Sequence, residues 1–261
     1  MKAGLRTLLL SAVAATGIAA PAAAGTILAL VDGTSIAHLD PTSLKAGKVV
    51  AVKTTDRLLG IDVRPADGML YGVTAAGLVV KVDPATGEVS PKAVLTEKLK
   101  DGVTATVDFN PAADKLRVMG SDGSSHRVDV DSGKVVIDGS HKWKEGDPGA
   151  SGSPSVVAGA YTNSVKGSKA PSTALYVVDA TAGALALQAP PNDGVLSTIG
   201  ALGVKGTGPM AFEVVAKDGG NTGWLLADGA LHQVDLATGK ATPAGKAAGL
   251  KGTVTDIAWW E

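Results

Sequence analysis

Short segments of alternating apolar and polar residues dominate this sequence, and turns rich in aspartate, proline and glycine separate them. The segments "LVVKV" and "EVSPKAV", on either side of the turn at residues 83–87, show this pattern. An alternation with a period of two predicts strands that bury one face. After the first 24 residues no long stretch keeps the apolar spacing of a helix. The whole chain contains 34 Gly and 13 Pro residues, which interrupt regular helices. The pattern predicts an all-β protein.

One turn recurs along the chain. "KVDPATGEV" at 81–89 returns as "RVDVDSGKV" at 127–135, "VVDATAGAL" at 177–185 and "QVDLATGKA" at 233–241, with a looser copy, "HLDPTSLKAGKV", at 38–49. Aspartate accepts backbone N–H bonds from the turn, proline presets φ, and glycine supplies a positive φ. Such a turn joins antiparallel strands, so each copy predicts a hairpin.

A second element also recurs, and together the two define a four-stranded unit. Its copies are "GIDVRP" from Gly60, "TVDFNP" from Thr106, "GAYTNS" from Gly159, "AFEVVA" from Ala211 and "TDIAWW" from Thr255. Three further strands follow each of the first four copies, which gives units at about 58–95, 103–139, 155–202 and 206–247. Four strands per repeated unit is the plan of a β-propeller blade.

The two ends of the chain complete the ring. Residues 25–53 supply three strands without a first one, and residues 254–261 supply a first strand alone. Joined, they form one blade and leave no open sheet edge. The sequence therefore predicts a five-bladed β-propeller of four-stranded blades, closed by pairing of the N- and C-terminal strands. The alternative is a pair of stacked sheets with similar hairpins; a sixth blade has no residues left to build it.

The first residues have the layout of a secretory signal peptide. Two cations, Lys2 and Arg6, precede an apolar stretch and the small residues Ala22 to Ala24. We expect cleavage after residue 24, a single domain over 25–261, and a periplasmic or secreted location. The apolar stretch is too short for a membrane span, and no later segment offers one.

Composition removes several classes of function. The chain has no cysteine, which excludes disulfides and thiolate chemistry. Without Lys2 and Arg6, 22 basic residues remain against 25 acidic ones, a formal charge of about −3, and no basic stripe suggests nucleic acid. Nine aromatic residues leave little material for the platforms that bind glycans. The expected partner is an envelope or extracellular molecule, whose identity stays open, as does the oligomeric state.

Alignment of the first strands brings polar residues toward the axis. Asp62, Asp108, Tyr161, Glu213 and Asp256 form one expected tier, and Arg64, Asn110 and Asn163 lie two residues later, with Val215 and Ala258 in the other two units. The candidate binding residues are therefore Asp62, Arg64, Asp108, Asn110, Tyr161, Asn163, Glu213 and Asp256.

This tier has two interpretations. Carboxylate and amide oxygens bind hard cations such as calcium, which takes six to eight oxygen ligands. Alternatively, each carboxylate accepts backbone N–H bonds from a neighbouring blade, and Arg64 offsets the local charge. Because unpaired carboxylates repel, some must be neutral, paired or metal-bound. We favour the structural interpretation and expect no resident metal or cofactor.

No catalytic residue is predicted. The turn "DVDSG" at 129–133 begins like a calcium loop, but Ser140 stands where the acidic residue at loop position twelve belongs. The four histidines are scattered, and no G-x-S-x-G, P-loop or H-E-x-x-H motif is present. Two long polar loops, 139–155 and 162–173, are additional places where a rigid scaffold can carry function.

Several longer phrases resemble a known family. "LLGIDVRPADGMLYGV", "VDFNPAADKLRVM", "AYTNS", "LQAPPNDGVLSTIGALGV" and "LATGKATPAG" are similar to the secreted bacterial family called domain of unknown function 4394, over nearly all of residues 25–261. The resemblance implies a propeller-like repeat and an extracytoplasmic location, and supplies no reaction or catalytic residue. Glu213 departs from the aspartate that the family pattern leads us to expect.

These observations favour an exported, non-enzymatic binding or interaction module. The alternative is a metal-dependent hydrolase, in which a cation in the propeller channel polarises a carbonyl and activates water. Its ligands or base would be Asp62, Asp108, Asn110, Asn163, Glu213 and Asp256.

Overall fold

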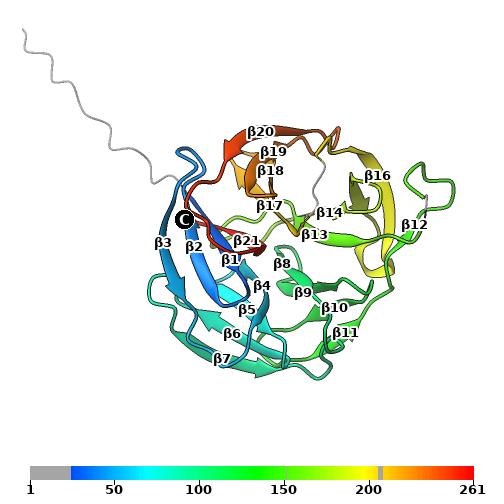
Figure 1. The fold of residues 1–261 in the computed structure, drawn as a ribbon. Coiled ribbons are helices and arrows are strands. Elements are labelled where there is room, and N and C mark those ends of the chain that lie inside the picture. The colour runs from blue at the N-terminus through cyan, green and yellow to red at the C-terminus, as the bar shows by residue number, and fades with distance from the viewer. Residues whose placement is uncertain (1–24, 151, 205–207) are drawn as a thin grey trace, which may run out of the picture.

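The computed structural model describes residues 25–150, 152–204 and 208–261, which form five separate sheets around a central axis (Figure 1). The protein is a five-bladed β-propeller, as the repeat predicts. Its one described helix is a single 3-10 turn, η1 (Pro191–Asp193). Within the described part of the chain, no helix is long and apolar enough to cross a membrane. The predicted signal peptide, residues 1–24, lies outside the described residues.

Each blade has one strand next to the axis, and its other strands follow outward from that one. From the axis outward, blade 1 comprises β21 (Val254–Trp260), β1 (Thr26–Val31), β2 (Ser35–Leu39) and β3 (Ala46–Ala51). Blade 2 comprises β4 (Leu58–Val63), β5 (Leu70–Thr74), β6 (Leu78–Val82) and β7 (Val89–Val94). Blade 3 comprises β8 (Ala105–Asn110), β9 (Lys115–Gly120), β10 (Ser125–Val128) and β11 (Val135–Ile137). Blade 4 comprises β13 (Val156–Tyr161), β14 (Leu175–Asp179), β15 (Ala184–Gln188), β16 (Val195–Ala201) and β12 (Lys142–Trp143). Blade 5 comprises β17 (Met210–Lys217), β18 (Gly220–Ala227), β19 (Ala230–Val234) and β20 (Ala241–Lys246).

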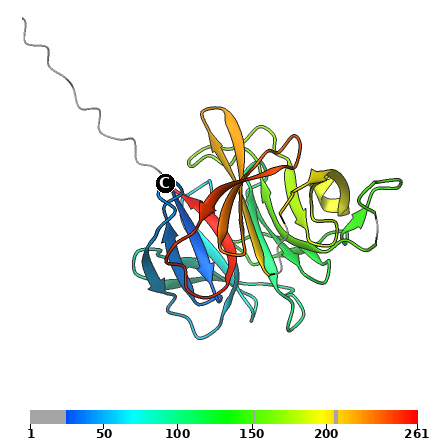
Figure 2. The same cartoon turned by 45° about the horizontal axis from the view of Figure 1, so that its top comes forward.

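The ends of the described chain share blade 1, which confirms the predicted closure. Strand β21 pairs antiparallel with β1, so that Thr26 lies opposite Trp260 and Leu28 opposite Ala258. Figure 2 shows the two strands side by side, β1 in blue and β21 in red. Because β21 is the axial strand of its blade, the closing pair lies at the centre of the molecule rather than at its edge.

Five apolar clusters hold the blades together, one at each interface between neighbours. Between blades 2 and 3, the rings of Tyr71 and Phe109 meet edge to face with centroids 5.4 Å apart. The interface of blades 3 and 4 is more polar, because the buried Arg117 stands where blade 2 has Tyr71. Its guanidinium donates to the Tyr161 hydroxyl (2.7 Å) and pairs with Asp138 (3.0 Å).

The repeated turn also packs against the preceding blade. In blade 3, Gly133 has a φ of 76°, and a Cβ there would overlap the carbonyl oxygen of Val94 at the end of β7. The Gly133 carbonyl accepts a bond from the Thr96 N–H (2.9 Å). The corresponding glycines of blades 2 and 5, Gly87 and Gly239, approach backbone atoms of the preceding blade in the same way. Glycine is required there both for its φ and for its lack of a side chain.

Blade 4 departs from the predicted repeat in two respects. Its turn from Asp179 to Gly183 joins β14 to β15, whereas the matching turns of the other blades join the third strand to the fourth. The third hairpin of blade 4 is instead the segment 189–194, which contains η1. In addition, the polar connection 139–155 contributes β12, which pairs in parallel with β16 and gives the blade a fifth strand.

The two kinds of turn glycine give a matched pair of mutants. Gly183 has a φ of 59° but open space around it. We expect Gly183→Ala to lower the free energy of unfolding by about 1 kcal/mol, because alanine is strained in the left-handed backbone conformation. Gly133→Ala adds the clash with the preceding blade and should cost at least about twice as much. Urea unfolding of both variants measures the difference in the free energy of unfolding. Equal losses of stability would mean that the turn does not pack against the neighbouring blade.

Candidate functional site

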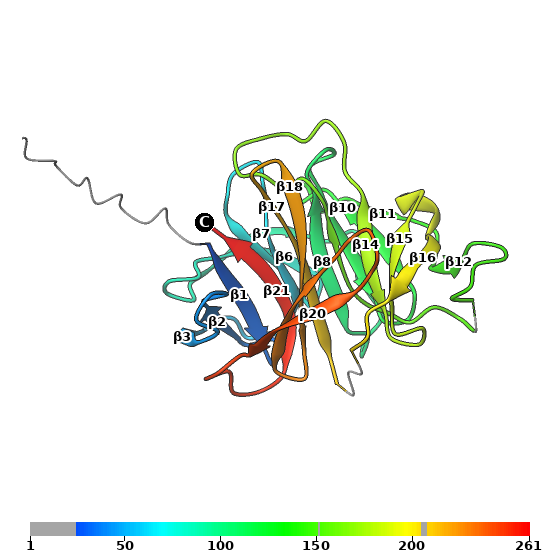
Figure 3. The same cartoon turned by 90° about the horizontal axis from the view of Figure 1, so that it is seen from above.

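Hydrogen bonds between neighbouring axial strands join equivalent positions in the same order, so the five strands run in the same direction along the axis. The propeller therefore has two distinct faces, and Figure 3 shows it from the side. The strand-end face carries the segments that follow β4, β8, β13 and β17, together with the C-terminus. The strand-start face carries the residues that precede these strands and begin β21. The axial channel therefore has two mouths with different linings.

Strand pairing determines which residues share a layer around the axis. Five residues pair with equivalent positions of the second strands and form the upper layer: Asp62, Asp108, Ala160, Glu213 and Ala258. A deeper layer, two residues earlier, consists of Gly60, Thr106, Ala158, Ala211 and Asp256. The structure thus brings together three of the five residues of the expected tier.

Tyr161 and Asp256 lie elsewhere, which corrects the expected tier. Tyr161 follows Ala160, and neighbouring residues of a strand point to opposite faces, so its side chain reaches Arg117 between blades 3 and 4. Asp256 lies in the deeper layer, where Gly60 leaves room for it. A Cβ on Gly60 would lie 2.5 Å from Asp256 Oδ2.

Each axial carboxylate accepts a backbone N–H from the next blade. The donors are Phe109 to Asp62 Oδ2 (2.6 Å), Tyr161 to Asp108 Oδ1 (2.8 Å), Trp259 to Glu213 Oε2 (3.2 Å) and Ile61 to Asp256 Oδ2 (3.0 Å). Asp256 also accepts a bond from the Thr106 hydroxyl (3.1 Å). These are the bonds that the structural interpretation of the acids expects, and ligand binding by the same residues stays a prediction.

An amide pair links blades 4 and 5, where the upper layer has Ala160 and no acid. The Asn163 N–H donates to Asn221 Oδ1, and Asn221 Nδ2 donates to Asn163 Oδ1, both at 2.8 Å. Asn163 therefore has a partner from β18. Sequence reasoning did not find Asn221, because β18 carries no polar repeat that would mark it.

Arg64 does not offset the charge of the axial acids, contrary to expectation. Its guanidinium donates to both carboxylate oxygens of Asp114 (2.6 and 2.8 Å) and to Asp131 (3.0 Å), and so ties blade 2 to the hairpins of blade 3. Asn110 Oδ1 accepts the N–H groups of Ala112 and Ala113 and closes a local turn. Arg64, Asn110 and Asn163 thus each have partners within the protein, and ligand binding by them stays a prediction.

Burial explains how four acidic side chains can lie close together on one axis. It raises the pKa of Asp62 to about 7 and raises the pKa of Asp108, Glu213 and Asp256 well above the usual range. The neighbouring carboxylates raise the pKa of Asp108 further. The backbone N–H bonds act in the opposite direction, and burial outweighs them. The raised pKa values mean that these acids take up protons at a higher pH than exposed acids do, and each proton taken up relieves the repulsion among them.

The upper layer is also the place where a cation could lie. Asp62, Asp108 and Glu213 each offer one oxygen, and these oxygens lie within 4.8 Å of one another. However, five of the six oxygens already accept a backbone N–H, two of them from the residue that follows the acid. Calcium requires six to eight oxygen ligands. The arrangement fits a set of blade-to-blade links better than a calcium site.

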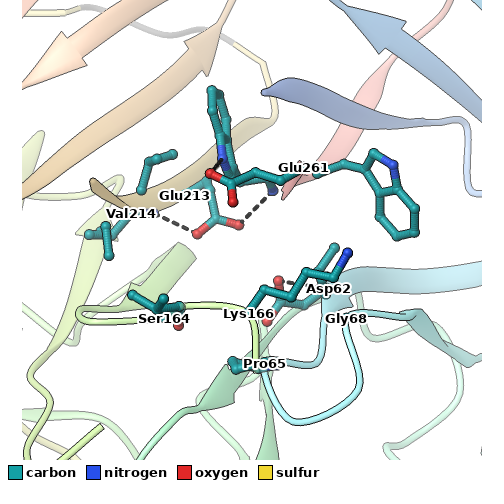
Figure 4. Close-up of a pocket in the computed structure, with 14 residues that line it drawn as sticks. Asp62, Pro65, Gly68, Ser164, Lys166, Glu213, Val214 and Glu261 are labelled. Carbon is teal, nitrogen blue, oxygen red and sulfur yellow. Dashed lines mark hydrogen bonds between the residues drawn. The ribbon is translucent and has the colours of Figure 1, made fainter. Parts of the chain in front are cut away.

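A loop covers the strand-end mouth. The segment 162–173 leaves blade 4 and passes over its neighbours: Gly167 N–H donates to the Pro65 carbonyl (2.8 Å), and Ala170 N–H to the Pro111 carbonyl (3.2 Å). The Lys166 side chain lies against Gly68. Figure 4 shows Lys166, Asp62 and Glu213 around the pocket that remains, whose volume is about 60 Å³. That volume admits only a few water molecules.

The strand-start mouth opens into a larger cavity of about 430 Å³. All five blades contribute to its lining, through Leu59, Thr106, Met119, Val157, Met210 and Thr255. Its volume lies within the range of small-molecule sites, roughly 300–1,000 Å³. Sequence reasoning missed this cavity. The available signal was positional, because most of these residues lie at or near the starts of the five axial strands.

The fold and the site define a class of protein: a five-bladed β-propeller with acids buried on its axis and a cavity at one mouth. The chain belongs to the family described as "Domain of unknown function (DUF4394)", whose model matches residues 11–258. The resemblance inferred from the sequence is confirmed.

Three solved structures with similar folds come from Bacteroides species. A structural genomics protein of unknown function from Bacteroides thetaiotaomicron VPI-5482 is 14% identical with a TM-score of 0.52, over 89% of this chain and 63% of that one. A protein of unknown function from Bacteroides caccae is 13% identical with a TM-score of 0.44, over 89% and 76%. An auxiliary nutrient binding protein from Bacteroides thetaiotaomicron VPI-5482 is 16% identical with a TM-score of 0.47, over 78% and 54%. These identities indicate likeness of fold alone. A search of curated proteins found no match.

The raised pKa of Asp62 predicts a specific pH dependence. A buried acid with a raised pKa contributes stability below its unfolded pKa, near 4, and that contribution is lost as the pH rises through the folded value, about 7. We expect Asp62→Asn to be less stable than the wild type at pH 5. The deficit should shrink toward pH 8 at up to about 1.4 kcal/mol per pH unit. Urea unfolding from pH 5 to 8 tests this, and a constant difference would contradict it.

Proposed function

We propose that this protein is an exported, non-enzymatic binding module that holds a small ligand in the strand-start cavity. The observation that carries the proposal is the cavity itself: about 430 Å³ on the axis, with apolar walls and hydroxyl groups, lined by residues of all five blades. The signal-peptide layout of residues 1–24 supports export.

The acid network supports this choice of mouth, because it gives the cavity a rigid floor. Thr106 lines the cavity, and its hydroxyl donates to Asp256, which in turn accepts backbone bonds from blades 2 and 3. Above this floor the upper layer of acids is engaged with the backbone, and the loop 162–173 covers the far mouth. Along the axis, a ligand of ordinary size has room at the strand-start mouth and little at the strand-end mouth.

The lining supports binding rather than catalysis. Among the described residues that line the cavity, the ionisable ones are Asp32 and Arg57. Asp32 Oδ1 accepts the N–H of Thr253 (2.9 Å), which ties it to the blade 1 connection. The Thr106 hydroxyl contacts Asp256, but burial raises the pKa of that acid. Asp256 also accepts the backbone N–H groups of Ile61 and Val107, which engages it as a link between blades rather than as a base for the Thr106 hydroxyl.

The second candidate is the metal-dependent hydrolase, and the specific observation in its favour is the approach of three carboxylates within 4.8 Å. In that case Asp62, Asp108 and Glu213 would hold the cation. The backbone N–H groups that already occupy five of the six carboxylate oxygens favour the binding module.

Filling the cavity tests the proposal. Thr104 and Ser121 are exposed lining residues, so Thr104→Trp and Ser121→Trp should fold and occlude the mouth. Val165→Trp, at the strand-end mouth, is the matched control. In NMR titrations with a library of small organic acids, amino acids and sugars, hits should shift the amides of Leu59, Val157 and Met210. Their affinity should fall at least about tenfold in the two filled variants and stay unchanged in the control. Ligands that bind the two filled variants as tightly as the wild type would contradict the proposal.

Metal analysis separates the two candidates. We expect purified protein to contain less than a stoichiometric amount of metal, and its melting temperature to stay within about 1 °C after chelation. Asp108→Asn provides the internal check, because it removes a carboxylate of the cluster. Stoichiometric metal that Asp108→Asn abolishes would favour the hydrolase.

A further inference from the structure

Arg57 is the one cation among the described residues that line the strand-start cavity. It directly precedes β4, its side chain is exposed, and it belongs both to the cavity and to an adjoining hollow lined by Leu99, Lys100 and Val103. Within the described part of the chain, no ion pair or side-chain hydrogen bond involves its guanidinium. An arginine at the rim of an apolar cavity, without a partner of its own, is suited to hold an anion.

The acids near Arg57 have other partners. Asp56 Oδ2 accepts the N–H of Ala76 (2.6 Å), and Asp32 Oδ1 accepts the N–H of Thr253. Asp101, in the adjoining hollow, pairs with Lys98 (2.6 Å). Lys100 adds a second positive charge to the same hollow. Asp32 and Asp56 keep their negative charge, but among the described residues no carboxylate forms an ion pair with Arg57, so its guanidinium is open to a ligand.

The remainder of the lining is apolar and adaptable. Met119 and Met210 extend two flexible side chains into the wall, beside Leu59 and Val157. Methionine accommodates ligands of varied shape. At the rim, Ser121 Oγ accepts the N–H of Thr104 (3.2 Å), which fixes a hydroxyl near the opening. Asp32, on the blade 1 side of the lining, would repel a ligand with several negative charges.

We infer that the ligand is an amphipathic monoanion, an alkyl or aryl acid whose apolar body lies in the cavity and whose charged group binds Arg57. This inference rests on the proposed function, because it assigns the ligand class of the same cavity. The body displaces water from the walls, and the guanidinium holds the acid group at the rim by charge-assisted hydrogen bonds.

Two fluorescent probes that share an aromatic body test the inference. One is the anion 8-anilinonaphthalene-1-sulfonate, and the other is neutral N-phenyl-1-naphthylamine. We expect Arg57→Gln to weaken the anionic probe about tenfold, the effect of one hydrogen bond to a charged group, and to leave the neutral probe within about twofold. Arg57→Lys should restore part of the affinity. Lys166→Gln, which removes a cation at the other mouth, is the matched control and should change neither probe.

The outcomes distinguish the ligand class from the proposed function. If both probes lose affinity in Thr104→Trp but Arg57→Gln leaves the anionic probe unchanged, the ligand class is overturned and the binding cavity stands. If neither probe responds to Thr104→Trp or Ser121→Trp, the cavity is not a binding site and both proposals fail. Thermal melts of each variant establish that the propeller is folded before titration.

Discussion

A carboxylate that accepts a backbone N–H from the next blade is the interaction on which this ring depends. The five sheets are separate, so their axial strands share no ladder of hydrogen bonds with one another. The N–H groups of Phe109, Tyr161 and Trp259 face a neighbouring blade, and a buried N–H without a partner is costly. Asp62, Asp108 and Glu213 supply the acceptors. Farther from the axis, the turns that contain Gly87, Gly133 and Gly239 pack against the preceding blade.

The buried axial acids also influence where the protein has room for a ligand. The acids that bind backbone at the centre are buried, and they form a floor across the channel. The loop 162–173 then covers the strand-end mouth through its bonds to Pro65 and Pro111. The strand-start mouth has no equivalent cover in the described structure and keeps its cavity. The structural role of the acids and the position of the proposed binding site are thus connected.

The repeat was predictable, whereas the register of one blade was not. The turn at Asp179 has the same sequence pattern as the turn at Asp129, yet it joins a different pair of strands. The phrase "GAYTNS" aligns Tyr161 with Asp108, although strand pairing makes Ala160 the equivalent residue. A shift of one residue turns a side chain to the other face of the strand. The expected tier therefore included Tyr161, which lies between blades, and Asp256, which lies one layer deeper.

The sequence by itself determined the all-β class, the fivefold repeat and the pairing of the two ends, because turn chemistry and the period-two alternation are local properties of the chain. Only the tertiary structure decided which acids share a layer, which partner Arg64 takes, and that a cavity opens at the strand starts. Those features depend on contacts between blades, where residues separated by up to about 200 positions meet, as Ile61 and Asp256 do. No local sequence pattern determines how one blade is rotated against the next. Nor does such a pattern determine how much space remains between the starts of the five axial strands.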